Sequence, residues 1–205
     1  MQGQEYLNQI SASNRPVKKS KMTNVLSSKL FIGGVIALVL LIIIMIIGSI
    51  LGGNKGGEKN DCYKLYLHLT AISEVIEEYQ NDIKSSDLRA SAASLKGVLN
   101  NTNNDLTEYL TEKYQFKEKE IDKDFIAEAN TAKDGLMAEL FEAKINGNLD
   151  RIFAHKMDYE ISLIATEETQ IVNSTSNDSL NELLVKSYGS LDSLYSKFSD
   201  FSETK

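Results

Sequence analysis

The side chains best suited to acid–base, nucleophilic or metal chemistry are scarce in this chain of 205 residues: two histidines, His68 and His155, and one cysteine, Cys62. Neither histidine has a glutamate three positions before it, the spacing with which di-iron helical bundles bind metal. A zinc or iron site needs about three or four such ligands, which two separated histidines cannot supply. We therefore predict no metal site, with His68 a surface residue beside a buried stripe and His155 a polar residue flanking Phe153 and Met157.

The chain also lacks the sequence signatures of other enzyme classes. It contains no G-x-S-x-G nucleophile elbow and no Gly-rich loop of the kind that cradles phosphate. Its many Asp and Glu residues are spread along the expected helices, where solvation is the ordinary explanation. We therefore expect no catalytic residue and no cofactor, and hence a protein that is not an enzyme.

The longest apolar segment runs from Leu30 to Leu51 and contains no charged residue. As a helix it is about 33 Å long, enough to cross a hydrocarbon core of roughly 30 Å. A cleaved signal peptide is the alternative, but the apolar region of a signal peptide is usually only about 7 to 15 residues long. The segment therefore predicts an uncleaved transmembrane helix at 30–51.

The distribution of charge predicts the orientation of this helix. Five basic residues and one acidic residue precede it, which gives the first 29 residues a net charge of +4 and the remainder −11. Cytoplasmic flanks of membrane helices carry the excess of Lys and Arg. We predict a single-pass protein of the cell membrane, embedded in the lipid bilayer, with residues 1–29 in the cytoplasm and the C-terminal domain outside. The acidic outer domain argues against nucleic acid as a partner.

Gly48 and Gly52 form a G-x-x-x-G pair at the outer end of this helix, a spacing that lets two membrane helices approach closely. Gly52 also begins residues 52–61, GGNKGGEKND, whose composition is typical of a flexible spacer. The pair therefore has two interpretations, a helix–helix contact in a homodimer or part of the spacer.

Cys62 is the only cysteine, so no disulfide can form within the chain and the fold must depend on packing. A lone thiol just outside a membrane can pair only with another chain or with a small thiol. However, Cys62 also begins an apolar helical stripe, and unpaired cysteines are among the most frequently buried residues. Two fates stay open for Cys62, a buried structural residue or an intermolecular disulfide.

Residues 62–205 carry the periodic pattern of long amphipathic helices. Apolar residues recur at spacings of three and four, which predict helices at 62–83, 88–109, 121–145, 149–171 and 180–201. The only proline, Pro16, lies outside this region, so no proline interrupts these helices. We predict an all-α domain, an antiparallel up-and-down bundle of four to five helices with packing like that of a coiled coil.

Three short segments bear on the ends of these helices. Ser85 and Ser86 offer an N-cap for the second helix, and Gly147 between two asparagines offers a stop for the third. The Asn-rich run 100–105 is a poor helix former, yet the apolar spacing continues through it. The pattern therefore favours an unbroken second helix.

Some segments resemble known families. The opening GQEYLNQISASNRP, the basic tail with its single anchor, and the run NLDRIFAHKMDYEISLI resemble uncharacterised single-pass envelope proteins of candidate-phylum bacteria, a likeness that implies no particular activity. Residues 123–157 are similar to a ferritin-like four-helix family of unknown function, in which spaced alanines precede an FA-x-x-M run, here Phe153, Ala154 and Met157. The family's histidine after that methionine is absent, and Tyr159 and Glu160 stand nearby instead.

An anchor, a helical bundle and no catalytic constellation indicate a membrane-anchored helical module outside the cytoplasm, which binds another envelope protein or a second copy of itself. Two alternatives stay open, a ligand-sensing ectodomain that acts through a partner and a degenerate ferritin-like domain. A sensor with a tail of 29 residues would need a partner to signal. A stoichiometric metal would favour the ferritin-like interpretation.

Overall fold

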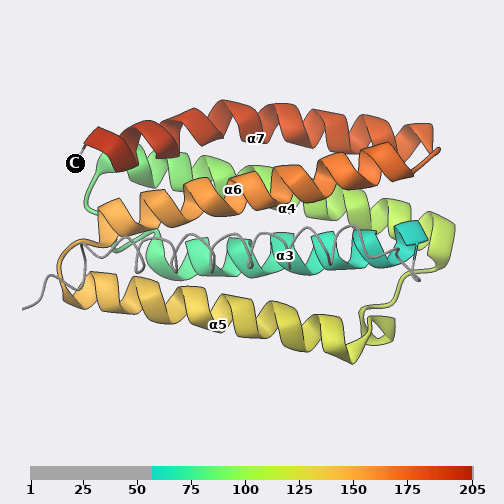
Figure 1. Cartoon of the computed structure of the whole chain (residues 1–205), viewed down its shortest axis with the longest axis horizontal. Helices are drawn as coiled ribbons and strands as arrows, with labels where there is room; N and C mark the ends of the chain where they lie inside the picture. Colours follow the sequence, from blue (N-terminus) through green and yellow to red (C-terminus); the bar gives the residue numbers. More distant parts are fainter. Residues whose placement is uncertain (1–56, 205) are drawn as a thin grey trace, which may run out of the picture. The chain divides into compact units, whose positions relative to one another are not determined.

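The computed structural model describes residues 57–204, which fold into five α-helices and one turn of 3₁₀ helix (Figure 1). Within this range the chain forms no strand, so the prediction of an all-α domain is confirmed. The elements are α3 (Gly57–Tyr79), α4 (Ser86–Tyr114), η2 (Glu118–Glu120), α5 (Lys123–Ile145), α6 (Leu149–Ser174) and α7 (Asp178–Thr204).

The predictions for the N-terminal part of the chain fall mostly outside the described residues. These are the basic tail, the transmembrane helix at 30–51 and the pair Gly48 and Gly52. None of the helices between residues 57 and 204 combines the length and the apolar character that crossing a membrane requires. α3 begins at Gly57 rather than at Cys62, so the last part of the predicted spacer is helical.

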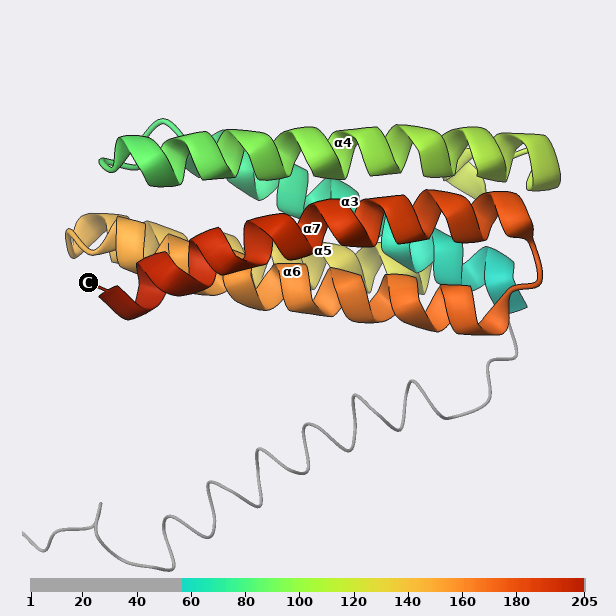
Figure 2. The ribbon, with the colours of Figure 1, turned by 90° about the horizontal axis from the view of Figure 1, so that it is seen from above.

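Four of the helices form a ring around one core. α3 packs against α4, α4 against α7, α7 against α6, and α6 against α3, while α5 lies outside the ring against α3 and α6 (Figures 1 and 2). A helical bundle is therefore confirmed. Successive helices run in opposite directions, but the neighbours α3 and α5 are parallel, so the expectation that all neighbouring helices are antiparallel is wrong for this pair. The reason is that residues 115–122 bring α5 against α3 rather than leaving it beside α4.

Local signals set the ends of the helices. The Ser85 hydroxyl accepts a hydrogen bond from the Leu88 amide at 3.3 Å, which caps α4 as predicted. Gln115, with φ of 54°, ends α4 in the left-handed conformation. Gly147, with φ of 73°, makes the tight turn between α5 and α6, a backbone conformation that favours glycine.

The Asn-rich run 100–105 lies within α4, which continues through it without a break, as predicted. Its side chains form contacts with α3. The Ser73 hydroxyl donates to the Asn100 side-chain carbonyl at 2.7 Å, and the Asn103 amide donates to the Thr70 hydroxyl at 2.8 Å. These hydrogen bonds between helices offset the poor intrinsic helix propensity of asparagine.

The apolar stripes meet in one continuous core. α5 buries only Leu136, Leu140 and Ala143 along its length, because it touches the ring on one side. The largest fully buried side chains are Phe153, Phe198, Leu65, Leu69, Ile76, Ile83, Leu88, Leu95, Leu99, Leu106, Leu110 and Leu140. Five polar residues are also buried among the described residues, namely Ser73, Ser91, Thr102, Glu168 and Ser187.

Candidate functional site

Glu168 on α6 is a carboxyl group that is completely buried in the core. The Ser187 hydroxyl of α7 donates to its Oε1 at 2.6 Å and lies 2.8 Å from the Thr102 hydroxyl of α4. The other oxygen, Oε2, has no hydrogen-bond partner among residues 57–204. Burial raises the pKa of Glu168 to about 7, against the lowering effect of the Ser187 hydrogen bond and with a smaller contribution from the charge of Glu167. These side chains form a polar layer that joins α4, α6 and α7.

Sequence reasoning missed Glu168, although the sequence contains a signal. The predicted stripe of the fourth helix steps from Ile164 to Ile171, and Glu168 occupies the position between them that the three-and-four spacing requires. Thr102 and Ser187 also stand at positions of the predicted stripes. A charged residue at a stripe position, opposite hydroxyl residues on other helices, indicates a polar contact within the core.

His68 connects α3 to α6 through two carboxylates. Its Nε2 lies 3.0 Å from Glu160 Oε2, its Nδ1 lies 3.0 Å from Glu167 Oε2, and its side chain is only 18% exposed. Burial lowers the pKa of His68, but the hydrogen bonds and charges of the two glutamates outweigh this effect and raise the pKa to about 10. The prediction of a surface residue is therefore wrong. The local pattern could not reveal these contacts, because the two glutamates lie 92 and 99 positions later in the chain.

The His68 bridge does not have the geometry of a metal site. The two ring nitrogens point in different directions, so one ion cannot contact both glutamates through this ring. Across the described helices, no three His, Cys, Asp or Glu side chains lie together as potential metal ligands. His155 is exposed, and Phe153 and Met157, which carry the ferritin-like resemblance, are completely buried in the core.

Cys62 lies near the start of α3 and is completely buried. Burial raises the pKa of its thiol to about 12, and the charges of Glu58 and Asp61 act in the same direction. A buried and protonated thiol is a poor nucleophile. Of the two fates considered, this geometry favours the structural cysteine, because an intermolecular disulfide requires this end of α3 to open.

Glu58 holds three segments together at the end of the bundle where α3 begins. Its Oε1 accepts hydrogen bonds from Lys113 Nζ at 2.6 Å, from the Tyr114 hydroxyl at 2.8 Å and from the Tyr109 hydroxyl. Its Oε2 accepts one from Thr175 in the connection between α6 and α7. Burial raises the pKa of Glu58, but these hydrogen bonds outweigh burial and lower the pKa to about 2. Glu58 is therefore a stable anion with a structural role.

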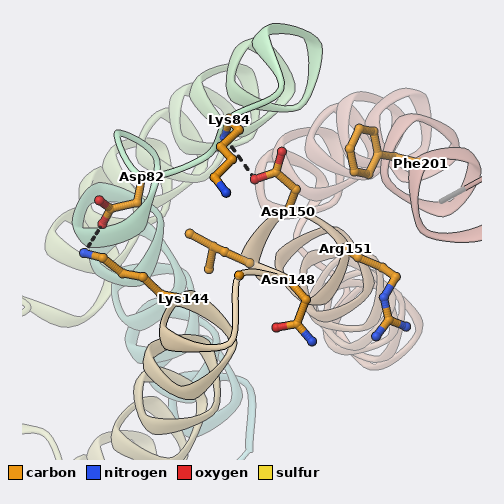
Figure 3. Close-up of a pocket in the computed structure, with 9 residues that line it drawn as sticks. Asp82, Lys84, Lys144, Asn148, Asp150, Arg151 and Phe201 are labelled. Carbon is orange, nitrogen blue, oxygen red and sulfur yellow. Dashed lines mark hydrogen bonds and ion pairs between the residues drawn. The ribbon is translucent and has the colours of Figure 1, made fainter.

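A cleft of about 460 Å³ opens at the opposite end of the bundle (Figure 3). It lies between the connection from α3 to α4, the start of α6 and the C-terminal part of α7, which contributes Phe201. Both acidic residues of the cleft are engaged. Asp82 pairs with Lys144 at 2.6 Å, and the Asp150 carboxylate accepts two backbone amide hydrogens at 2.9 and 2.8 Å.

The cleft is also lined by two further cations, Lys84 and Arg151. Neither side chain forms an ion pair with a carboxylate in the part of the chain that the structure describes. Figure 3 shows Lys84 extending toward the middle of the cleft and Arg151 at its side. The first turn of α6 adds the positive end of a helix, and its N-cap residue Asn148 forms no side-chain capping bond there. The cleft is therefore a positively charged site on an acidic domain.

Comparisons with protein-family models, with curated proteins and with solved structures find no match for this chain. The two resemblances noted in the sequence therefore stay predictions. Function has to be inferred from the residues and contacts described above.

Proposed function

We propose that the chain is a membrane-anchored, non-enzymatic helical module outside the cytoplasm, which binds an anionic group of another envelope component in the cleft. One observation carries the proposal: Lys84 and Arg151 find no carboxylate partner among residues 57–204, while the acidic residues of the same cleft are already engaged. A carboxylate or phosphate of a partner would supply the missing counter-charge through charge-assisted hydrogen bonds.

The position of the cleft supports this role. α3 begins at one end of the bundle, and its 23 residues extend about 34 Å toward the end that carries the cleft. In the sequence, an anchor at 30–51 would connect to the start of α3. The cleft lies at the other end of this helix.

The other titratable groups discussed above have structural contacts, which supports binding rather than catalysis. His68 is held between two glutamates, Glu58 accepts hydrogen bonds from four side chains, and Cys62 is a buried neutral thiol. None of these three residues lines the cleft. They therefore offer no nucleophile or base to a group bound there.

Chemical cross-linking in intact cells tests the cleft as the binding site. The full-length chain with Lys84→Glu and Arg151→Glu should capture at least about tenfold less of its partner, because reversed charges repel an anionic group. The matched control carries Lys119→Glu and Lys123→Glu, two exposed lysines at the other end of the bundle, with the same change in net charge. Equal capture by both variants, or no specific capture by the parent chain, would refute the proposal.

Protease treatment of intact cells tests the anchoring and the orientation separately. Protease added outside should remove the helical domain and leave residues 1–51 with the membrane, because the basic flank is expected to face the cytoplasm. A domain that is digested only after lysis would reverse the predicted topology. A chain that washes off membranes in high salt would refute the anchor.

A further inference from the structure

A second hollow, separate from the cleft, runs along the outer side of α6 and α7. We call it the α6–α7 groove; its volume is about 400 Å³. Its α6 wall presents mainly small side chains, namely Ser162, Ala165, Thr166 and Thr169. Its α7 wall presents large ones, Tyr188 and Tyr195, which are 45% and 39% exposed. Val185, which is 60% exposed, precedes Tyr188 on α7 by one helical turn.

The α6–α7 groove is nearly free of charge on a domain that is strongly acidic. Asp192 is the one charged residue among those that line it. The acidic residues in the same stretch of α6 do not line the groove: Glu160 and Glu167 bind His68, and Glu168 is buried in the core. Depletion of charge together with exposed tyrosines is the compositional signature of a protein–protein interface.

We propose that the α6–α7 groove binds a second copy of this chain, in a symmetric dimer whose two-fold axis runs along the bundle. The remainder of the chain after residue 29 carries a net charge of −11, so two copies repel one another across most of their surface. The groove lets them meet with a single carboxylate from each copy, that of Asp192, in place of rows of carboxylates. A symmetric dimer requires a self-complementary face, and this face carries both a small-residue wall and a ridge of tyrosines.

The direction of the helices decides how the two copies pair. An axis along the bundle places α6 of one copy against the partner subunit's α7, and these two helices are antiparallel, as α6 and α7 are within one copy. The tyrosine ridge of each copy then fills the small-residue wall of the other. An axis across the bundle would instead place small residues against small residues and leave the hollow unfilled. This inference does not depend on the proposed function, since the cleft and the groove share no lining residue.

Cysteine cross-linking of the full-length chain in its native membranes tests this pairing. Two differently tagged chains, one with Thr166→Cys and one with Tyr188→Cys, are co-expressed and treated with a short bifunctional maleimide. We expect a mixed cross-link between the two chains as the main product, and the buried Cys62 should not compete. A main product that joins two chains with Thr166→Cys would overturn the proposal. So would a yield of mixed cross-link no higher than the yield from two chains that both carry Thr131→Cys.

A matched pair of charge substitutions tests whether this face holds the dimer together. Thr166 in the groove and Thr131 on α5 are both exposed, and each hydroxyl donates to the carbonyl four residues earlier at 2.8 Å. Thr166→Glu places two carboxylates in the symmetric contact and should weaken dimerisation at least about tenfold. Thr131→Glu should leave it unchanged, with the same helical content in both variants. Single-molecule photobleaching measures the dimer fraction, and an equal fraction in both variants would refute the contact.

Discussion

The Glu168 carboxyl group of α6 and the Ser187 hydroxyl of α7 lie 2.6 Å apart in a core where the second carboxyl oxygen has no hydrogen-bond partner among the described residues. A carboxyl group in this setting is stable when protonated and costly when charged. The bundle therefore has a titratable group at its centre whose protonation affects its stability.

Stability should fall as the pH rises through the titration of Glu168. Its folded-state pKa of about 7 lies above its ordinary value of 4.5, so the folded chain binds the proton more tightly than the unfolded chain. The loss should begin near pH 4.5 and be complete above pH 7, reaching up to about 3 kcal/mol at 1.36 kcal/mol per pKa unit. Thermal unfolding of the full-length chain, measured at a series of pH values, should show that stability falls less steeply with pH in Glu168→Gln than in the parent chain. The same dependence on pH in both chains would contradict the prediction.

The His68 bridge should make a second contribution, at higher pH. Because the folded-state pKa of about 10 exceeds the ordinary 6.5, the stabilisation is complete below pH 6.5 and is lost as the pH rises through about 10. His68→Gln should therefore cost about 1–3 kcal/mol at pH 6, since it removes hydrogen bonds between charged groups. The difference from the parent chain should narrow toward pH 10. The exposed His155→Gln serves as the control, and an equal effect of both substitutions would count against the bridge.

Glu58 should determine the resistance of the bundle to acid. Its folded-state pKa of about 2 is below the ordinary 4.5, so the stabilisation is present above pH 4.5 and is lost as the pH falls through about 2. Glu58→Gln should destabilise the protein by about 1–3 kcal/mol at neutral pH and reduce the loss of stability in acid. Acid unfolding followed by circular dichroism measures both effects. Glu112→Gln, at an exposed position of α4, should change neither.

Leu191→Asp should disrupt the fold. Leu191 on α7 is completely buried, and an aspartate there places an unpaired charge in the core. We expect a loss of about 3–5 kcal/mol, in the range reported for uncompensated buried charges. Ser193→Asp, two positions along on the exposed side, should be nearly neutral. Urea denaturation compares the two, and similar midpoints would show that this part of α7 is not packed as described.

Cys62 should react with thiol reagents only when the bundle unfolds. Its burial and its raised pKa both reduce the fraction of exposed thiolate at neutral pH. Alkylation should therefore be slow in the native full-length chain and fast in denaturant, whereas a cysteine introduced by Lys64→Cys at an exposed site should react in both. A dimer on non-reducing gels that Cys62→Ser abolishes would instead support the intermolecular disulfide.

The helices of the bundle could be predicted from the sequence because their signals are local. A stripe such as Leu184, Leu191 and Phe198 repeats with the period of the helix, and Ser85 and Gly147 mark where helices begin and end. The apolar segment 30–51 is likewise a property of consecutive residues, and its role as an anchor stays a prediction.

The pairing of the helices could not be predicted in this way. The neighbours α4 and α7 are distant in the sequence, and the position of α5 outside the ring depends on how its narrow apolar face fits against α3 and α6. Periodicity shows that a helix has a buried face, but not which helix covers it.

The polar contacts show the same division between sequence and tertiary structure. Glu168 at a stripe position is visible in the sequence, whereas its contact with Ser187 and the two glutamates around His68 exist only because α6 lies against α7 and α3. The residue type determines whether a side chain can ionise, but its pKa, and so its charge at a given pH, depends on burial and on neighbours brought from distant parts of the chain. For the same reason, composition determines that the domain is acidic. Only the fold places Lys84 and Arg151 in a cleft where neither pairs with a carboxylate among residues 57–204. Only the fold, too, turns Glu160 and Glu167 of α6 toward His68 rather than into the α6–α7 groove.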